Sequence, residues 1–125
     1  MVEREIDMRL VMVLVLFFVA SDAQAGEVEE AHRQALQGRD SYWNCLAREY
    51  TQDRIKSMSA ADFTADIAGA CPSERQNFRV TLLDYLNTQY PDVGSDAHLT
   101  TANHAIELAQ KDVVTAFVRR KAAPN

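Results

Sequence analysis

The stretch SDAHLTTANHAIELAQKDVVTAFVRRK, residues 95–121, decides the fold class of this chain. Its apolar residues recur every three or four positions, which is the spacing of one face of an α-helix. The residues of this stripe are Leu99, Ala102, Ile106, Ala109, Val113 and Phe117. The cations at 119–121 follow the stripe, where positive charge suits the negative end of a helix dipole. The spacing therefore predicts an amphipathic helix that opens at Ser95 or Asp96.

The segment 27–55 is predicted to form the first helix of the folded domain. Its apolar residues at helical spacing are Val28, Ala31, Ala35, Tyr42, Leu46 and Tyr50. Gly38 interrupts this face, and we expect a bend there because glycine is a weak helix former.

Ser59 marks the predicted start of a short second helix. With Asp62 three residues later it forms a capping-box pattern, in which each side chain satisfies a free backbone N–H group. Phe63 and Ile67 then lie on one face, which we expect to be buried.

A third helix is predicted after Pro72, a residue expected to end the preceding helix. Ser73 and Gln76 form a second capping-box pattern. The face of this helix is formed by Phe78, Leu82, Tyr85, Leu86 and Gln89. The clearest loop of the chain follows, over residues 91–96.

Four amphipathic helices with short connections predict an all-α fold, a small antiparallel bundle. Glycine and proline are sparse, and no stretch alternates apolar and polar residues as a strand does. Residues 26–125 are long enough for one domain and too short for two.

The start of the chain has the pattern of a secretory signal peptide. Leu10–Ala20 is an uncharged apolar run of 11 residues. A helix needs about 20 residues to cross a bilayer, whereas this length fits a signal peptide. Ala23-Gln24-Ala25 predicts cleavage after Ala25. An uncleaved membrane anchor is the alternative interpretation, and Met8 is a possible true start because Arg9 follows it.

The two cysteines, Cys45 and Cys71, lie in the predicted mature part. Exported proteins mature in an oxidising compartment, where an even number of cysteines indicates disulfides. We therefore predict a structural Cys45–Cys71 bridge.

The charge balance argues against a nucleic-acid partner. Residues 1–25 hold four acidic and two basic residues, so their removal changes the formal net charge from −5 to −3. Proteins that bind nucleic acids normally present a basic face. No cofactor motif is present either, and we predict no cofactor.

Two groups of residues have the composition of a chemical site. Glu29 with His32, and His104 with Glu107, have the three-residue spacing of metal ligands on one helix. A di-iron bundle needs further inward-facing acids, which are not evident, so these four are metal candidates only and we predict no metal site. The neighbours Ser95, Asp96 and His98 contain the residue types of a catalytic triad. A triad usually joins distant segments, so we expect these three to cap a helix.

Tyr42 and Trp43 form an aromatic pair just before Cys45. Packing of the core and the disulfide is one interpretation. The other is a surface for a partner, because tyrosine and tryptophan are common interface anchors. Neighbouring residues point about 100° apart on a helix, so Trp43 is the better candidate for an exposed anchor.

Three segments carry a resemblance to a broader class of proteins. They are Ala23-Gln24-Ala25, Trp43-Asn44-Cys45-Leu46-Ala47 and Gly69-Ala70-Cys71-Pro72-Ser73-Glu74. The chain resembles the small exported two-cysteine helical proteins of Gram-negative bacteria. This resemblance implies a periplasmic or secreted location and transfers no activity.

These observations predict a non-enzymatic periplasmic helical module that binds a protein or envelope partner. The alternative is a helical bundle that binds a metal or a small ligand. An enzyme is the third hypothesis.

Overall fold

The computed structural model describes the backbone of residues 2–123 and the side chains of residues 24–123. Over this part the chain forms α1 (Val2–Tyr50), the short 3-10 helix η1 (Asp53–Ser57), α2 (Ala60–Gly69), α3 (Pro72–Gln89) and α4 (Ser95–Ala122). The described backbone contains no strand. The predicted all-α fold with four α-helices is confirmed.

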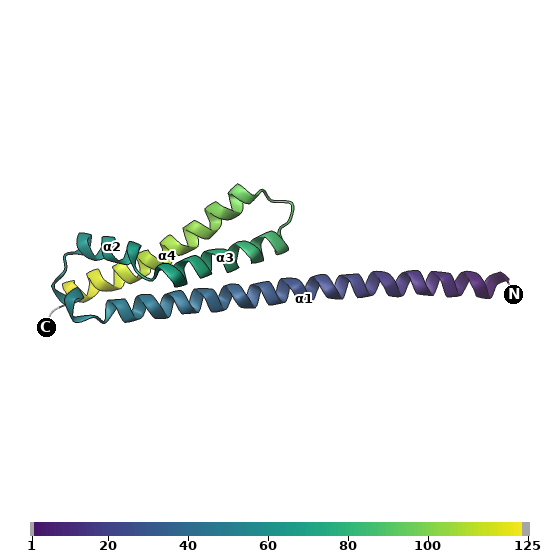
Figure 1. Ribbon diagram of the computed structural model, residues 1–125, viewed down its shortest axis with the longest axis horizontal. Coiled ribbons are helices and arrows are strands. Elements are labelled where there is room, and N and C mark those ends of the chain that lie inside the picture. Colours follow the sequence, from purple (N-terminus) through teal and green to yellow (C-terminus); the bar gives the residue numbers. More distant parts are fainter. Residues whose placement is uncertain (1, 124–125) are drawn as a thin grey trace.

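The helices pack as a bundle on one end of α1. Figure 1 shows α3 folding back along α1 and α4 returning beside α3, so α3 runs antiparallel to both neighbours. α3 supplies the main contacts of α1, and α2 packs against α4. The N-terminal part of α1 extends well beyond the other helices (Figure 1).

Every helix contributes to one hydrophobic core. The buried residues of its main cluster are Tyr42, Leu46, Ile55, Phe63, Ile67, Phe78, Ile106, Ala109, Val113 and Phe117. Phe63 and Phe117 stack with ring centroids 4.1 Å apart, which joins α2 to α4. The predicted apolar faces of α2 and of the C-terminal half of α4 are therefore confirmed.

The beginning of α4 differs from the predicted stripe. Leu99 is 43% exposed, whereas the neighbouring His98 is only 4% exposed. The Nε2 atom of His98 lies 3.0 Å from the Tyr90 carbonyl oxygen, which can only accept, so the ring donates this hydrogen bond. The hydrogen bond to the α3–α4 loop turns His98 inward, and Leu99 then points outward.

The first helix differs from the prediction at both ends: it begins at Val2 rather than residue 27 and ends at Tyr50 rather than residue 55. The Thr51 hydroxyl donates to the Arg48 carbonyl oxygen at 2.9 Å, which satisfies one of the free carbonyls at the helix end. The chain then turns through η1, and Ile55 enters the core with 1% of its surface exposed. Burial of Ile55 in the core therefore accompanies the early end of α1.

Of the two predicted capping boxes, the first supplies a helix cap, and it does so through the Ser59 side chain alone. The Ser59 hydroxyl accepts a hydrogen bond from the Asp62 backbone N–H at 3.1 Å, at the start of α2. The prediction that Ser73 caps the next helix is wrong, because α3 already begins at Pro72 and has Cys71 as its N-cap residue. Proline is favoured at the first helical position, where its missing N–H group costs nothing.

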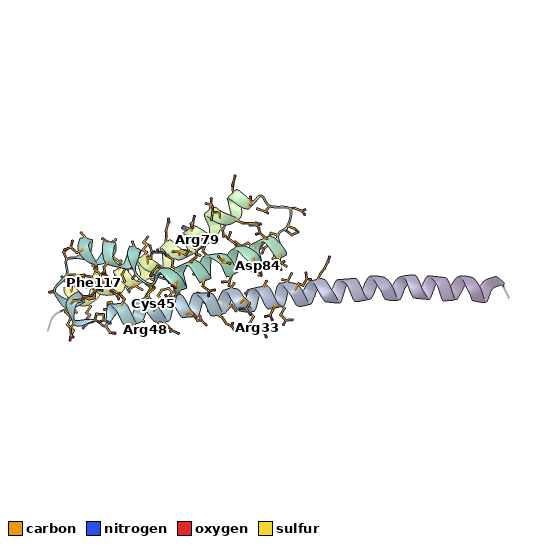
Figure 2. The ribbon with its side chains drawn as sticks, viewed as in Figure 1. Arg33, Cys45, Arg48, Arg79, Asp84 and Phe117 are labelled. Atoms are coloured by element: carbon orange, nitrogen blue, oxygen red, sulfur yellow. A yellow bond between two sulfur atoms is a disulfide. The ribbon has the colours of Figure 1, made fainter. Side chains whose placement is uncertain are left out.

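The predicted disulfide between Cys45 and Cys71 is present. The two Cα atoms are 6.1 Å apart, and the cysteines are 26 positions apart in the sequence. Figure 2 labels Cys45 on α1, beside the start of α3. The bridge therefore closes a loop that contains the end of α1, η1 and α2.

Gly38 does not bend α1, contrary to the sequence prediction. Figure 1 shows α1 running through this region without a marked bend. Gly38 is instead buried where α1 meets α3. A Cβ atom at this position would lie 2.6 Å from the Thr81 Oγ1 atom and 3.2 Å from the Phe78 Cα atom. Glycine therefore allows the close approach of the two helices.

Gly38→Ala is expected to lower the free energy of unfolding by about 1–2 kcal/mol. Overpacking costs about 1–3 kcal/mol, and alanine returns at most about 1 kcal/mol of helix propensity. Gly69→Ala is the matched control, because no heavy atom lies within 4 Å of the Cβ it would add. Urea denaturation of both variants measures the difference. Equal stability of the two variants would contradict a tight α1–α3 contact at Gly38.

Candidate functional site

A cleft opens between α1 and the C-terminal end of α3. Its volume is about 970 Å³. The lining residues are Gln24, Ala25, Glu27, Val28, Glu29 and His32 from α1, Tyr85, Thr88 and Gln89 from α3, and Pro91 from the following loop. Figure 1 shows that α1 continues past the point where α3 ends and α4 turns back.

An aromatic contact joins the two sides of the cleft. The rings of His32 and Tyr85 have centroids 4.9 Å apart and are inclined by 42°. Val28 and Pro91 add apolar surface to the lining. The antiparallel packing of α1 and α3 brings these residues together from positions far apart in the sequence.

The charged groups of the cleft are carboxylates. Glu27 and Glu29 line it, no lysine or arginine does, and neither acid forms an ion pair among the described residues. Glu30, the next residue, does not line the cleft and is paired with a cation. Hydrogen bonds from Arg33 and then Gln34 hold the pKa of the Glu30 carboxyl below its ordinary value. Negative charge in the cleft therefore comes from Glu27 and Glu29; Arg33 lies close enough to Glu29 to interact with it electrostatically, but it forms its ion pair with Glu30.

An apolar tip lies next to the cleft, at the α3–α4 connection. Tyr90, Val93 and Leu99 are 49%, 47% and 43% exposed. The Val93 backbone N–H donates to the Tyr90 carbonyl at 3.2 Å, the same carbonyl that His98 contacts. Two hydrogen bonds thus hold the tip in a defined shape. The three exposed apolar side chains all belong to the α3–α4 connection and the first turns of α4.

The structure separates the four metal candidates. Glu29 and His32 line the cleft, whereas His104 and Glu107 lie on α4 and do not. Among the described residues, the group of three metal-ligand types within reach of one another is Cys45, Cys71 and Glu74. The two cysteines are bonded to each other, so they offer no thiolates.

The triad-like group is not assembled for catalysis. His98 points to the Tyr90 carbonyl, while Ser95 and Asp96 are exposed in the first turn of α4. The helix opens at Ser95 as predicted. The predicted cap is wrong, because Gly94 is the N-cap residue and no side chain caps the helix.

The predicted aromatic surface is reduced to one residue. Tyr42 is fully buried, and its hydroxyl accepts a hydrogen bond from the Gln110 Nε2 atom at 3.1 Å. Tyr42 therefore belongs to the core and cannot form a binding surface. Trp43 is partly buried and packs against the core. Its role as an anchor stays a prediction, and it lies well along α1 from the cleft.

The cations at the end of α4 make local contacts. The Arg120 guanidinium lies 5.4 Å from the centre of the Tyr50 ring. The Lys121 ammonium lies 5.2 Å from the centre of the Phe117 ring and also donates to the Met58 carbonyl. These contacts fix the C-terminal end of α4 against the preceding segments.

Sequence reasoning did not identify Tyr85 as a site residue and placed it only on the inward face of its helix. The signal that could have found it is the antiparallel pairing itself. If Cys45 and Cys71 are joined and the two helices run in opposite directions, a residue about 13 positions before Cys45 lies beside a residue about 13 positions after Cys71. His32 and Tyr85 fit that count closely.

The predicted signal peptide lies almost wholly outside the part of the chain whose side chains are described. The run Leu10–Ala20 falls there, so cleavage after Ala25 and export stay predictions. In the part with described side chains, no helix is both long enough and apolar enough to cross a membrane. Comparisons of this chain with models of known protein families, with curated proteins and with solved structures find no match.

Proposed function

We propose that this chain is a non-enzymatic helical module of the periplasm that binds a protein partner through the cleft between α1 and α3. One observation carries the proposal: the cleft combines apolar walls with unpaired carboxylates and lies beside an exposed apolar tip. Binding sites are commonly concave, mostly apolar and marked by a few polar groups.

The proposed location is supported by the disulfide. The disulfide between Cys45 and Cys71 is typical of oxidising compartments. The predicted cleavage would remove Gln24 and Ala25 from the rim and leave the rest of the lining, from Glu27 onward, in the mature protein.

The chemistry of the cleft favours a basic partner segment. Glu27 and Glu29 attract positive charge, and Asp92 adds a further acid next to Pro91. Val28, Tyr85 and Pro91 offer apolar contact to a side chain that enters between the helices. Complementary charge guides association and fixes the orientation of a partner. We therefore expect a lysine- or arginine-containing segment with an apolar anchor.

Photo-crosslinking tests the proposal. A photoreactive residue in place of Gln89, inside the cleft, is expected to form a defined product with one envelope protein in living cells. Glu29→Lys is expected to reduce this product about tenfold, because it places a cation opposite a basic segment. Asp112→Lys makes the same charge change on the exposed part of α4, outside the cleft, and is expected to leave the product unchanged.

Two results would contradict a cleft that binds a basic segment. One is a product of equal yield in the Glu29→Lys and Asp112→Lys variants. The other is no product at all from Gln89.

The alternative, metal binding, is supported by the presence of both Glu29 and His32 in the cleft. Metal analysis of gently purified native protein separates the two functions. Stoichiometric metal that is lost in His32→Ala would favour the alternative, and metal-free protein would remove it.

A further inference from the structure

A second hollow, of about 450 Å³, lies where α2 ends, α3 begins and α4 passes both. Its polar lining includes Arg75 and Arg79 from α3, and Asn103, Glu107 and Gln110 from α4. Figure 2 labels Arg79 where α3 and α4 lie next to each other. This hollow is separate from the cleft between α1 and α3, with which it shares no lining residue.

The two arginines of this hollow have only neutral partners. The Arg75 guanidinium donates to the Ala68 carbonyl. The Arg79 Nε atom donates to the Asn103 Oδ1 atom at 2.9 Å, and its Nη1 atom donates to the Gln76 Oε1 atom at 2.5 Å. Both side chains are partly buried. Neither is paired with a carboxylate among the described residues.

Three of the exposed arginines in the described chain are paired with acids, whereas Arg48, Arg119 and Arg120 are exposed to water and have no such pair. Arg33, Arg39 and Arg54 each pair with a glutamate or an aspartate, although all three are exposed at the surface. A charged group that is partly removed from water normally gains an opposite charge. Arg75 and Arg79 are partly buried and line a hollow, yet neither forms an ion pair with a described residue, although Glu107 lines the same hollow.

The geometry of α3 places the two guanidinium groups on the same side. Residues four positions apart are neighbours on a helix surface, and like charges at this spacing repel. An anion between them would remove the repulsion. Each guanidinium carries five N–H donors in a planar fork, and Arg79 uses only its Nε and Nη1 atoms in the contacts above. The remaining donors suit the paired oxygens of a carboxylate or a phosphate.

We propose that this hollow is an oxyanion-binding site that takes the carboxylate or phosphate group of a small molecule. Arg75 and Arg79 hold the anion, and Asn103 positions Arg79 through the bond to its Nε atom. Glu107 lines the same hollow and opposes an anion, so it limits the affinity. The site is independent of the proposed protein-binding cleft, and either can fail without the other.

NMR titration of the disulfide-bonded protein tests this site. Inorganic phosphate and acetate are added separately, with sodium chloride at matched ionic strength as the reference. The Arg79 Nε–H signal and the Asn103 side-chain amide are expected to shift and to saturate in the millimolar range with at least one of the two anions. The Arg39 Nε–H signal is expected to shift no more than it does in chloride.

Two variants with opposite expected effects separate binding from a purely structural role. Arg79→Gln is expected to weaken binding about tenfold, whereas Glu107→Gln is expected to strengthen it several-fold by removing the opposing charge. Arg39→Gln, which removes an arginine elsewhere on the surface, is expected to leave the affinity unchanged. Glu107 is exposed, so its replacement leaves the fold intact and the test stands even where Arg79→Gln destabilises α3.

The anion whose titration curve saturates identifies the chemical class of the ligand. Saturation by phosphate alone supports a phosphorylated ligand, and saturation by acetate supports a carboxylate. Shifts that grow linearly and equally with phosphate, acetate and chloride would overturn the site. So would an unchanged or lower affinity in Glu107→Gln.

Discussion

Phe63→Ala is expected to lower the free energy of unfolding by about 3–5 kcal/mol, the range for a large aromatic side chain removed from a core. Phe63 is fully buried. It stacks on Phe117 at 4.1 Å, and its ring centre lies 6.1 Å from that of Tyr50. One side chain thus joins α2 to α4 and to the end of α1.

The size of this effect follows from the shortness of α2. The helix has 10 residues, and its buried residues are Phe63 and Ile67. Isolated helices shorter than about 12 residues are marginal in water, so packing must hold α2 in place. Native domains are stable by only about 5–15 kcal/mol, so this single truncation removes a large share of the total.

Urea denaturation followed by fluorescence of the single tryptophan, Trp43, measures the loss. Val118→Ala is the control, because Val118 lies on α4 next to Phe117 in the sequence but is 45% exposed. We expect the control to change stability by less than about 0.5 kcal/mol. A loss below about 1.5 kcal/mol for Phe63→Ala would contradict the central place of Phe63 in the core.

The helices themselves could be predicted because their signals are local. Ile106, Ala109, Val113 and Phe117 repeat at helical spacing, and all four are buried. The Ser59 cap depends on a side chain and a backbone group only three residues apart. The disulfide could be predicted because the chain has only two cysteines to pair.

The errors arise where a distant contact overrides the local pattern. The helical spacing continues past Tyr50, but the chain turns there and Ile55 is buried in the core from η1. No local sequence signal marks this turn. Leu99 continues the stripe of α4, but the loop carbonyl of Tyr90 draws His98 inward instead. A glycine inside a helix suggests a bend at Gly38, and only the position of Thr81 shows that Gly38 permits close packing of α1 and α3.

The candidate sites were the least predictable part. The spacing of Glu29 and His32 predicted possible metal ligands, yet the contact that His32 makes across the cleft is with the ring of Tyr85. Arg75 and Arg79 gave no signal, because their lack of acidic partners is a property of the packed structure. A site assembled from two or three helices depends on their pairing and register, which the periodicity of each helix alone does not contain.

Loss of the disulfide is expected to lower the free energy of unfolding by about 3.5 kcal/mol, from the chain entropy of a loop of this length. Intact mass before and after reduction and alkylation first establishes that Cys45 and Cys71 are joined. Urea denaturation with and without reductant then measures the stabilisation. Cys45→Ala/Cys71→Ala is the control, and its stability is expected not to respond to reductant. A response of the control, or a loss below about 1 kcal/mol on reduction, would contradict this account.

The effects of reduction and of Phe63→Ala are expected to add within about 0.5 kcal/mol, because they act on different states of the chain. The bridge restricts the unfolded ensemble, whereas Phe63 fills the native core. The closed loop contains the whole of α2, so a bridge that also ordered α2 in the native state would break this additivity. A four-state comparison of wild type and Phe63→Ala, each oxidised and reduced, decides the matter. A coupling above about 1 kcal/mol would show that the disulfide holds α2 against α4 directly.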